Sequence, residues 1–351
     1  MNLNRVEKIA NAVLYEGYIL YPYRPAALKN QQRFNFGVLS PRVYSESQQG
    51  SDPWQMQTEC LLQTEAAATL DVKVRFLWLV SRQIGKLLKP TLKVDASAAE
   101  YELVPELQAG ERIFQAWQEA VEADVSAQQL TLDSLLAETY CQPFRFAASQ
   151  EEEHISDPEG KVVGVIIRTR NQLDGMLEVS AEPCGEVFRL KVVVKNLTET
   201  DISFGGRDEA LTSAMVSVHT ILGITSGRFV SLMDPPKQFK AAAANCNNIG
   251  TWPVLAGKEG EGDLVLSSPI ILYDYPEVAA ESPGDLCDAT ETDELLTLCI
   301  MSLTDEEKRA MRSADDRARR ILERTETLPA EQLLKMHGAI RGLKRVDVKG
   351  Q

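Results

Sequence analysis

The chain has 351 residues, with 37 Lys and Arg against 51 Asp and Glu, so its formal net charge at pH 7 is −14. A surface that binds nucleic acid or an anionic membrane needs concentrated basic side chains, and this charge balance disfavours both partners. The length predicts two or three domains, and an apolar content of 44% is enough for each domain to bury a core.

The chain contains no run of 18 apolar residues, so the sequence predicts no membrane-spanning helix. Its N-terminus carries acidic and basic residues together and leads into no long apolar segment, unlike a secretory signal. The six cysteines are scattered, and no two have the C-x2-C spacing of a zinc or redox site. We therefore expect a cytoplasmic protein with reduced thiols.

The first predicted element is a short helix over residues 4–14, in which apolar residues recur every three or four positions. Residues 15–41 are aromatic, basic and interrupted by prolines. The clearest half-buried strand follows, because apolar residues at every second position from 72 to 80 alternate with Lys73 and Arg75.

The middle of the chain mixes clear and ambiguous signals. Residues 111–125 fit either a helix or a strand, and residues 131–139 predict a short helix that Thr131 caps. Residues 149–161 are polar and rich in turn formers, which predicts a loop or a domain boundary near residues 150 to 160. Three alternating strands separated by turns fill residues 161–200, a pattern typical of an antiparallel β-sandwich.

The later part of the chain begins with residues 208–224, which are apolar and fit either a helix or a strand. Residues 228–276 predict a strand, a short Ala-rich helix and then an extended segment. Two helices are predicted near the C-terminus. Residues 304–307 form a capping box at the start of the first, and Pro329 opens the second.

These elements predict an α+β protein. Its β-rich body would consist of one or two sandwich-like antiparallel units, joined to a helical C-terminal part. The expected domains are a β-rich N-terminal domain over 1–150, a β-sandwich-like domain over 151–287 and C-terminal helices over 288–351.

No catalytic residue, metal site or cofactor site is predicted. His154 follows three glutamates and is interpreted as solvated, His219 as a core or interface histidine, and His337 as a surface residue. Acidic neighbours would raise the pKa of Cys184, and Cys246 lies in a polar segment, so both are interpreted as structural thiols. Glycine-rich phosphate loops and nucleophile elbows do not occur in the sequence.

Six acidic residues crowd into positions 281–294, after the apolar run at 269–273. They could hold Ca²⁺ or Mg²⁺, but they lack the alternating spacing of a calcium loop. The charged first turn of a helix is the preferred interpretation.

Aromatic residues stand beside prolines in two segments, 14–37 and 266–296. Exposed aromatic side chains next to rigid turns are typical of protein-binding surfaces, so we predict that both segments contribute to one such surface. Packing of these aromatic residues in a β-core is the alternative. The predicted partner-binding residues are Tyr18, Tyr21, Tyr23, Arg24, Arg33, Tyr273, Asp274 and Tyr275.

A resemblance to a known family is carried by three strings, VLYEGYILYPYRPAALKNQQRFNFGVLSP, GTWPVLAG and LSSPIILYDYPEVAAESPGDLCDATETDELLTL. The chain resembles an uncharacterised bacterial protein family encoded alongside operons for NiFe hydrogenases of the oxygen-tolerant uptake type. The resemblance covers about residues 10 to 340. It supplies no catalytic residues, and it implies an accessory or assembly role.

We therefore expect a non-catalytic accessory protein that binds a hydrogenase subunit or a maturation partner. Two alternatives belong to other classes: a metal- or thiol-dependent enzyme whose ligands converge only in the fold, and a structural sandwich module unrelated to hydrogenase. Convergence of Cys, His and acidic side chains in a pocket would favour the enzyme. A shared exposed face for the predicted tyrosines would favour partner binding.

Overall fold

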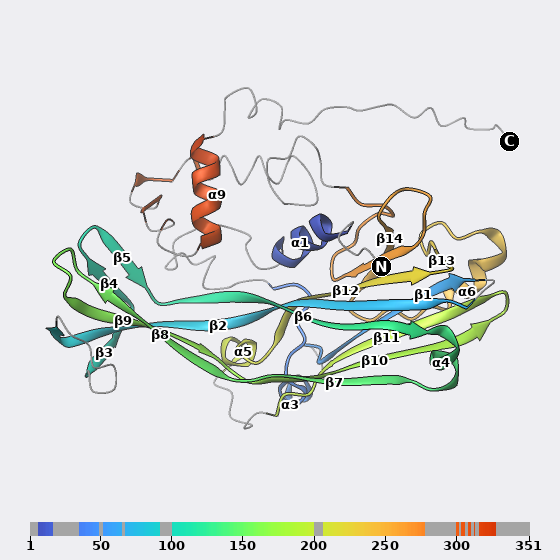
Figure 1. Ribbon diagram of the computed structural model, residues 1–351, viewed down its shortest axis with the longest axis horizontal. Helices are drawn as coiled ribbons and strands as arrows, with labels where there is room; N and C mark the ends of the chain where they lie inside the picture. The colour runs from blue at the N-terminus through green and yellow to red at the C-terminus, as the bar shows by residue number, and fades with distance from the viewer. Residues whose placement is uncertain are drawn as a thin grey trace.

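The computed structural model forms an elongated body in which antiparallel strands dominate (Figure 1). It describes residues 6–16, 35–48, 52–64, 67–91, 100–199, 206–277 and 316–327, and residues 300, 301, 303–305, 308, 309 and 312.

One sheet has five strands, and every pairing in it is antiparallel. In spatial order these strands are β13 (Arg228–Val230), β1 (Gln55–Gln63), β11 (Val187–Asn196), β10 (Leu173–Cys184) and β7 (Tyr140–Phe146). Burial alternates along β10, as the period of two in its sequence predicts, so one face of this sheet is apolar.

The second sheet has eight strands, also antiparallel. Its main path is β14 (Trp252–Ala256), β15 (Leu264–Ser268), β12 (Met215–Thr225), β2 (Thr69–Thr91), β9 (Val162–Arg170) and β8 (Ser149–Ser156). Two further strands pair with β2 off this path, β3 (Tyr101–Val104) and β6 (Trp117–Thr131).

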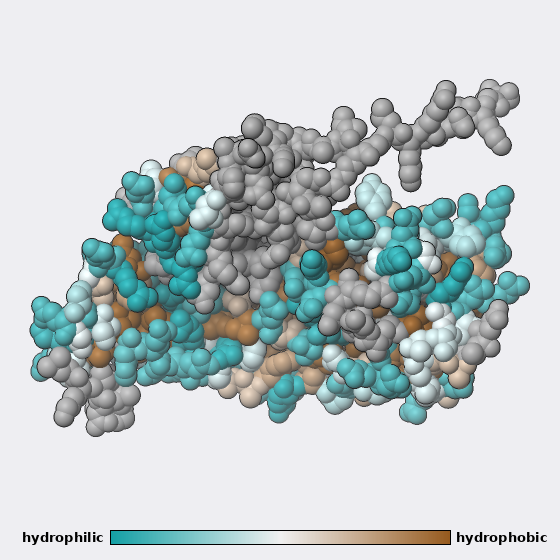
Figure 2. Space-filling view, turned by 45° about the horizontal axis from the view of Figure 1, so that its top comes forward, coloured by the Kyte–Doolittle hydropathy of each residue, from teal (hydrophilic) through white to brown (hydrophobic). Residues whose placement is uncertain are grey.

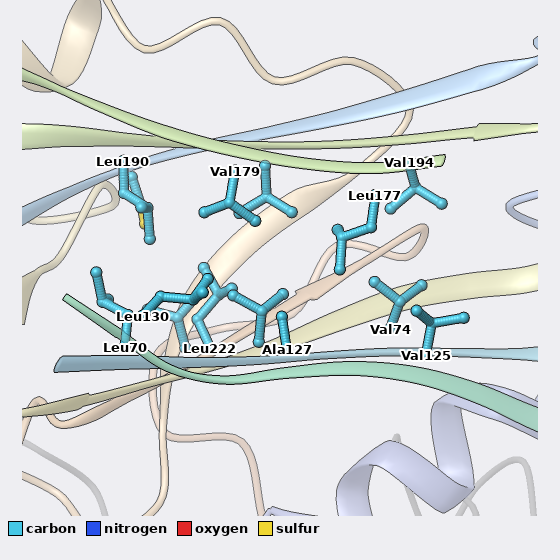
Figure 3. Packing of buried hydrophobic residues seen from close by; sticks show 14 of the residues in the cluster. Leu70, Val74, Val125, Ala127, Leu130, Leu177, Val179, Leu190, Val194 and Leu222 are labelled. Carbon is cyan, nitrogen blue, oxygen red and sulfur yellow. The ribbon is translucent and has the colours of Figure 1, made fainter. Parts of the chain in front are cut away.

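The two sheets pack face to face and enclose the main hydrophobic core. Figure 3 shows the inner side chains pointing toward one another, with Leu177, Val179, Leu190 and Val194 on the five-stranded sheet and Leu70, Val74, Val125, Ala127, Leu130 and Leu222 on the other. Each fully buried aliphatic side chain of this size contributes about 1.5–3 kcal/mol. The sandwich is therefore the stable centre of the molecule.

The long strand β2 passes through two environments. Its first half is buried on both faces, because Phe76 and Trp78 enter the main core while Leu77 and Leu79 pack on the opposite face with Leu14. Beyond Arg82 its partners include β9 and β3, and it extends past the sandwich (Figure 1).

Helix α1 (Glu7–Glu16) covers the outer face of the eight-stranded sheet. Its apolar face follows the predicted spacing and packs against β12, β14 and β15. The residues in this contact are Val6, Ile9, Ala10, Val13, Ile221, Val254, Ala256, Leu264 and Leu266.

The remaining elements are short. A hairpin of β4 (Glu106–Ala109) and β5 (Arg112–Gln115) packs against the extended end of β2. The short helices are α3 (Arg42–Ser47), α4 (Leu132–Ala137), α5 (Arg207–Leu211), the 3-10 turn η2 (Lys237–Phe239) and α6 (Lys240–Ala244). The predicted cap of α4 is confirmed, because the hydroxyl of Thr131 accepts a hydrogen bond from the backbone N–H of Ser134 at 3.3 Å.

The predicted α+β fold with a helical C-terminal part is wrong. The described helices are few and short, and in the region expected to be helical the one helix with defined bounds is α9 (Asp316–Thr327). A capping box and favourable end charges specify where a helix starts, but a helical layer also needs an apolar face to pack. Of the side chains described in α9, only Leu322 and Thr325 are buried.

Two ambiguous segments are strands: residues 111–125 fall largely in β5 and β6, and residues 208–224 contain β12. The loop predicted over 149–161 is wrong, because most of it is β8. The acidic side chains of β8 are tolerated in a strand since Glu153 and Glu151 pair with Arg168 and Arg170 of β9.

Each sheet takes strands from both sides of residue 150, where a domain boundary was expected. Within the residues that the structure describes, no helix combines the length and apolar character needed to cross a bilayer.

Candidate partner-binding surface

Three of the eight predicted partner-binding residues, Tyr273, Asp274 and Tyr275, lie in the described part of the chain. They follow β15 and run beside β14. The other five residues, Tyr18, Tyr21, Tyr23, Arg24 and Arg33, lie outside the described residues. Whether the two aromatic segments form one surface therefore stays a prediction.

Asp274 fixes the backbone of its segment. Its Oδ1 accepts a hydrogen bond from the N–H of Leu255 at 2.8 Å, and its Oδ2 accepts one from the hydroxyl of Ser231 at 2.5 Å. The N–H of Tyr275 donates to the carbonyl of Leu255 at 2.6 Å. These bonds tie the segment to β14 and to the residue after β13, so the carboxylate of Asp274 is occupied within the protein.

The aromatic residues on either side of Asp274 have different surroundings. Tyr273 is 81% exposed, whereas Tyr275 is partly buried and packs against the main core. Tyr275 also has a φ of 56°, a left-handed conformation that is uncommon for a bulky residue and that turns the chain here. The side chain of Tyr273 is therefore accessible, whereas Tyr275 anchors the segment, and a binding role for either residue stays a prediction.

Other large apolar side chains are exposed around β14. Ile271 is 73% exposed, Met233 49% and Trp252 45%. We call these three residues, together with Tyr273, the β14 surface. Met233 is linked to Asp274 through Ser231, whose hydroxyl oxygen accepts from the N–H of Met233 at 3.1 Å. Single exposed apolar residues are ordinary, whereas several that form one continuous patch are typical of a binding surface.

The exposure of Ile271, Met233 and Trp252 was not predicted from the sequence. One signal was available, because Ile271 and Tyr273 are two residues apart in an extended segment and therefore share a face. The exposure of Met233 and Trp252 depends on how β13 and β14 end in the fold, which no local pattern specifies.

A second cluster contains thiols that are far apart in the sequence. Cys184 of β10 and Cys246, just after α6, pack against the same hydrophobic cluster, and an Nη2 donor of Arg189 lies 3.8 Å from the Cys184 sulfur. Burial raises the pKa of Cys246 to about 11, although the nearby Arg189 guanidinium acts in the opposite direction. Burial also raises the pKa of Cys60.

The thiols of Cys246 and Cys60 are therefore protonated at neutral pH, and a protonated thiol is a poor nucleophile and a poor metal ligand. Among the described residues, no three His, Cys, Asp or Glu side chains are placed to hold a metal ion. Cys141 is exposed on β7, while Cys287 and Cys299 lie outside the described residues.

The surroundings of Cys246 have a structural use. The carboxylate of Glu59 accepts from the N–H of Asn247 at 2.8 Å, and the side chain of Asn248 exchanges hydrogen bonds with the backbone of Glu59. Gln57 donates to the carbonyl of Asn247 at 2.9 Å. This network holds the segment after α6 along β1.

His219 is fully buried in β12, under α1. Burial lowers the pKa of its imidazole to about 4, while Nδ1 donates a hydrogen bond to the carbonyl of Ser217 at 3.0 Å. Its Nε2 has no hydrogen-bond partner among the residues that the structure describes. The ring is thus neutral and belongs to the core, as the sequence predicts. His154 is exposed on β8, and His337 lies outside the described residues.

Comparison of the chain with family models and with curated proteins finds no match. The resemblance to the hydrogenase-associated family therefore stays a prediction.

Proposed function

We propose that this is a non-catalytic accessory protein that binds another protein through the β14 surface. The main support for this proposal is that two apolar side chains are highly exposed on a segment whose backbone is held by hydrogen bonds. Ile271 and Tyr273 are 73% and 81% exposed, and the two hydrogen bonds accepted by Asp274 hold the segment that carries them.

This arrangement suits protein recognition for an energetic reason. Binding costs conformational entropy when it orders a mobile segment, and a segment that is already held avoids much of that cost. Aromatic and aliphatic side chains at the centre of an interface supply most of its binding energy, with about 2 kcal/mol or more from each hot-spot residue.

The proposed partner is a NiFe hydrogenase subunit or a maturation protein of that enzyme. The support is the family resemblance of the segments that contain Trp252, Ile271 and Tyr273. The proposed location is the cytoplasm, where such assembly takes place.

The test is a pull-down with the tagged full-length chain from its native host, grown under conditions that induce hydrogenase, with bound proteins identified by mass spectrometry. The wild-type chain is expected to recover a hydrogenase subunit or maturation protein. The double variant Ile271→Ala/Tyr273→Ala is expected to recover at least tenfold less, since two hot-spot contacts are lost.

A matched control keeps the test specific. Leu88 and Leu103 are 59% and 54% exposed near the extended end of β2, so Leu88→Ala/Leu103→Ala removes a comparable exposed apolar pair. This control should recover the partner as the wild type does. Equal loss in both variants would refute the β14 surface, and recovery of no hydrogenase protein by the wild type would refute the proposed partner.

A further inference from the structure

Two cysteines that are far apart in the sequence meet on the outer face of the five-stranded sheet. Cys184 ends β10, Cys246 follows α6, and both pack against a buried cluster that contains Leu61 of β1. The neighbour of Leu61 in β1, Cys60, belongs to the main core, so Leu61 and the two cysteines lie on the opposite side of the sheet. Cys184 and Cys246 are both partly exposed, whereas Cys60 is buried.

The side chain of Arg189 shows that the two sulfurs are neighbours. Arg189 of β11 is paired with Glu182 of β10, and its Nη2 lies 3.8 Å from the sulfur of Cys184. Burial raises the pKa of Cys246 to about 11, and a hydrogen bond from the same guanidinium acts in the opposite direction. One guanidinium therefore contacts both thiols, and the charge of Cys184 also acts on Cys246.

The two cysteines are attached to backbone of different stiffness. Cys184 is paired with Val187 in the β10–β11 ladder. Cys246 ends a helix of five residues with no buried side chain, and its N–H donates to the carbonyl of Ala243 at 3.1 Å. The next residue, Asn247, is held by Glu59. A disulfide needs the two Cα atoms within about 7 Å, and this arrangement keeps Cys246 at the sheet while α6 can adjust.

The cluster lies at an end of the molecule that faces water. Helix α6 is at the right of Figure 1, and Figure 2 shows hydrophilic side chains over that end of the molecule, with smaller hydrophobic patches between them. Because Cys184 and Cys246 are both partly exposed, a polar reagent in solution can reach them.

We propose that Cys184 and Cys246 form a reversible disulfide when the protein meets a low-molecular-weight disulfide such as oxidised glutathione. In the first step the thiolate of Cys184 attacks one sulfur of oxidised glutathione, the disulfide bond of the reagent breaks, and one glutathione thiolate leaves. In the second step the thiolate of Cys246 attacks the Cys184 sulfur and displaces the second glutathione. The cysteine pair loses two electrons and two protons, and the reagent takes them up as two glutathione thiols.

The surroundings of the two thiols set the order of these steps. Burial keeps Cys246 protonated at neutral pH, so it is a poor first attacker on a reagent in solution. A thiol held beside its target needs no collision from solution, which offsets its low ionisation in the second step. In a reducing compartment the resulting bond is transient and responds to oxidant exposure. The site is separate from the β14 surface and does not depend on its partner.

The test incubates the full-length protein with oxidised glutathione and maps its disulfides by mass spectrometry of the digested, unreduced protein. A peptide pair joined through Cys184 and Cys246 is expected, and it should disappear after treatment with dithiothreitol. Cys246→Ser should lose this link and retain one glutathione on Cys184, because the second step lacks its thiol. Cys184→Ser should also lose the link, with far less glutathione on Cys246.

Cys141→Ser is the matched control, because Cys141 is exposed on β7. It should form the link as the wild type does. The measurement on the wild type needs no variant, so it stands even if a substituted protein does not fold. The proposal is overturned if the oxidised wild type is modified only at other cysteines, if Cys141→Ser loses the link, or if folded Cys246→Ser leaves Cys184 unmodified.

Discussion

The two halves of strand β2 rest on different kinds of interaction. In the sandwich half, Phe76 and its neighbours are buried on both faces between apolar side chains. In the extended half, exposed positions appear in the strand, and a network of charges crosses the sheet. In that network Glu119 bridges Arg82 and Arg168 at 3.1 and 2.8 Å.

The difference shows that one continuous strand can be stabilised by apolar burial in one half and by paired charges in the other. Burial between two sheets is non-directional and tolerates many apolar sequences. A single sheet layer has less apolar area to bury, so paired charges and the small cluster around Ile84 must hold it. The sandwich should therefore unfold as one unit, while the extension opens at lower cost.

The largest expected effect comes from Phe76→Ala in the sandwich. Phe76 is fully buried and meets the ring of Phe146 edge-on at a centroid distance of 5.6 Å. Loss of this side chain should lower the free energy of unfolding by about 3–5 kcal/mol, measured by urea denaturation.

Ile84→Ala in the extension should instead raise the rate of amide hydrogen exchange in β9 and β3, while the amides of the sandwich stay protected. Equal loss of protection in both regions would contradict the comparison.

Glu119→Gln tests the charge network directly. Its side chain is 17% exposed and that of Arg82 is 6% exposed, so the substitution leaves a buried guanidinium without its carboxylate. We expect the free energy of unfolding to fall by about 2–3 kcal/mol. The exposed ion pair of Arg42 and Glu46 is the control. Glu46→Gln should change the free energy of unfolding by less than about 0.5 kcal/mol. Similar losses of stability in the two variants would show that the buried network stabilises the protein no more than an exposed ion pair does.

Acid should weaken the sandwich half through His219. Its folded pKa of about 4 lies below the value of about 6.5 for an exposed histidine, so the unfolded chain takes up the proton first as pH falls. The histidine has no effect above about pH 6.5, and stability is lost as pH falls toward 4. The nearby charges of Arg75 and Lys73 act in the same direction as burial.

Between about pH 7 and pH 5 this loss amounts to about 2 kcal/mol. His219→Asn removes the titrating group. Between pH 7 and pH 5 the free energy of unfolding of this variant should therefore fall by about 2 kcal/mol less than that of the wild type. Urea denaturation at both pH values measures the difference. An identical fall in the two proteins would rule out His219 as the cause.

The smallest expected effect is at the cap of α4, which closes one side of the sandwich. Thr131→Ala removes the hydroxyl that accepts from the N–H of Ser134 and should cost about 1 kcal/mol. Thr131→Ser keeps the hydroxyl and should cost less. Thermal unfolding followed by circular dichroism measures both, and equal costs would mean that the cap contributes nothing.

The sequence was most informative where a local pattern and the final packing agree. The alternation around Phe76 predicted a strand, and the position of Thr131 predicted a helix start, because both signals depend on neighbouring residues alone. The length of β2 was not predictable, since its extended half is stabilised by β9 and β3, which lie far away in the sequence.

The candidate sites were harder to predict for the same reason. Tyr273 and Asp274 are neighbours in the sequence, and both were predicted to bind a partner. The side chain of Tyr273 is exposed to solvent, whereas the carboxylate of Asp274 accepts hydrogen bonds from Leu255 and Ser231.

The 23 residues of β2 also set a distance. At about 3.3 Å per residue, the strand is roughly 75 Å long, and the paired neighbours on both sides keep it from bending freely. The strand therefore fixes the separation between the sandwich, whose edge carries the β14 surface, and the extension, against which the β4–β5 hairpin packs. A single partner that touched both would have to be elongated itself, whereas two compact molecules could bind at the same time without colliding.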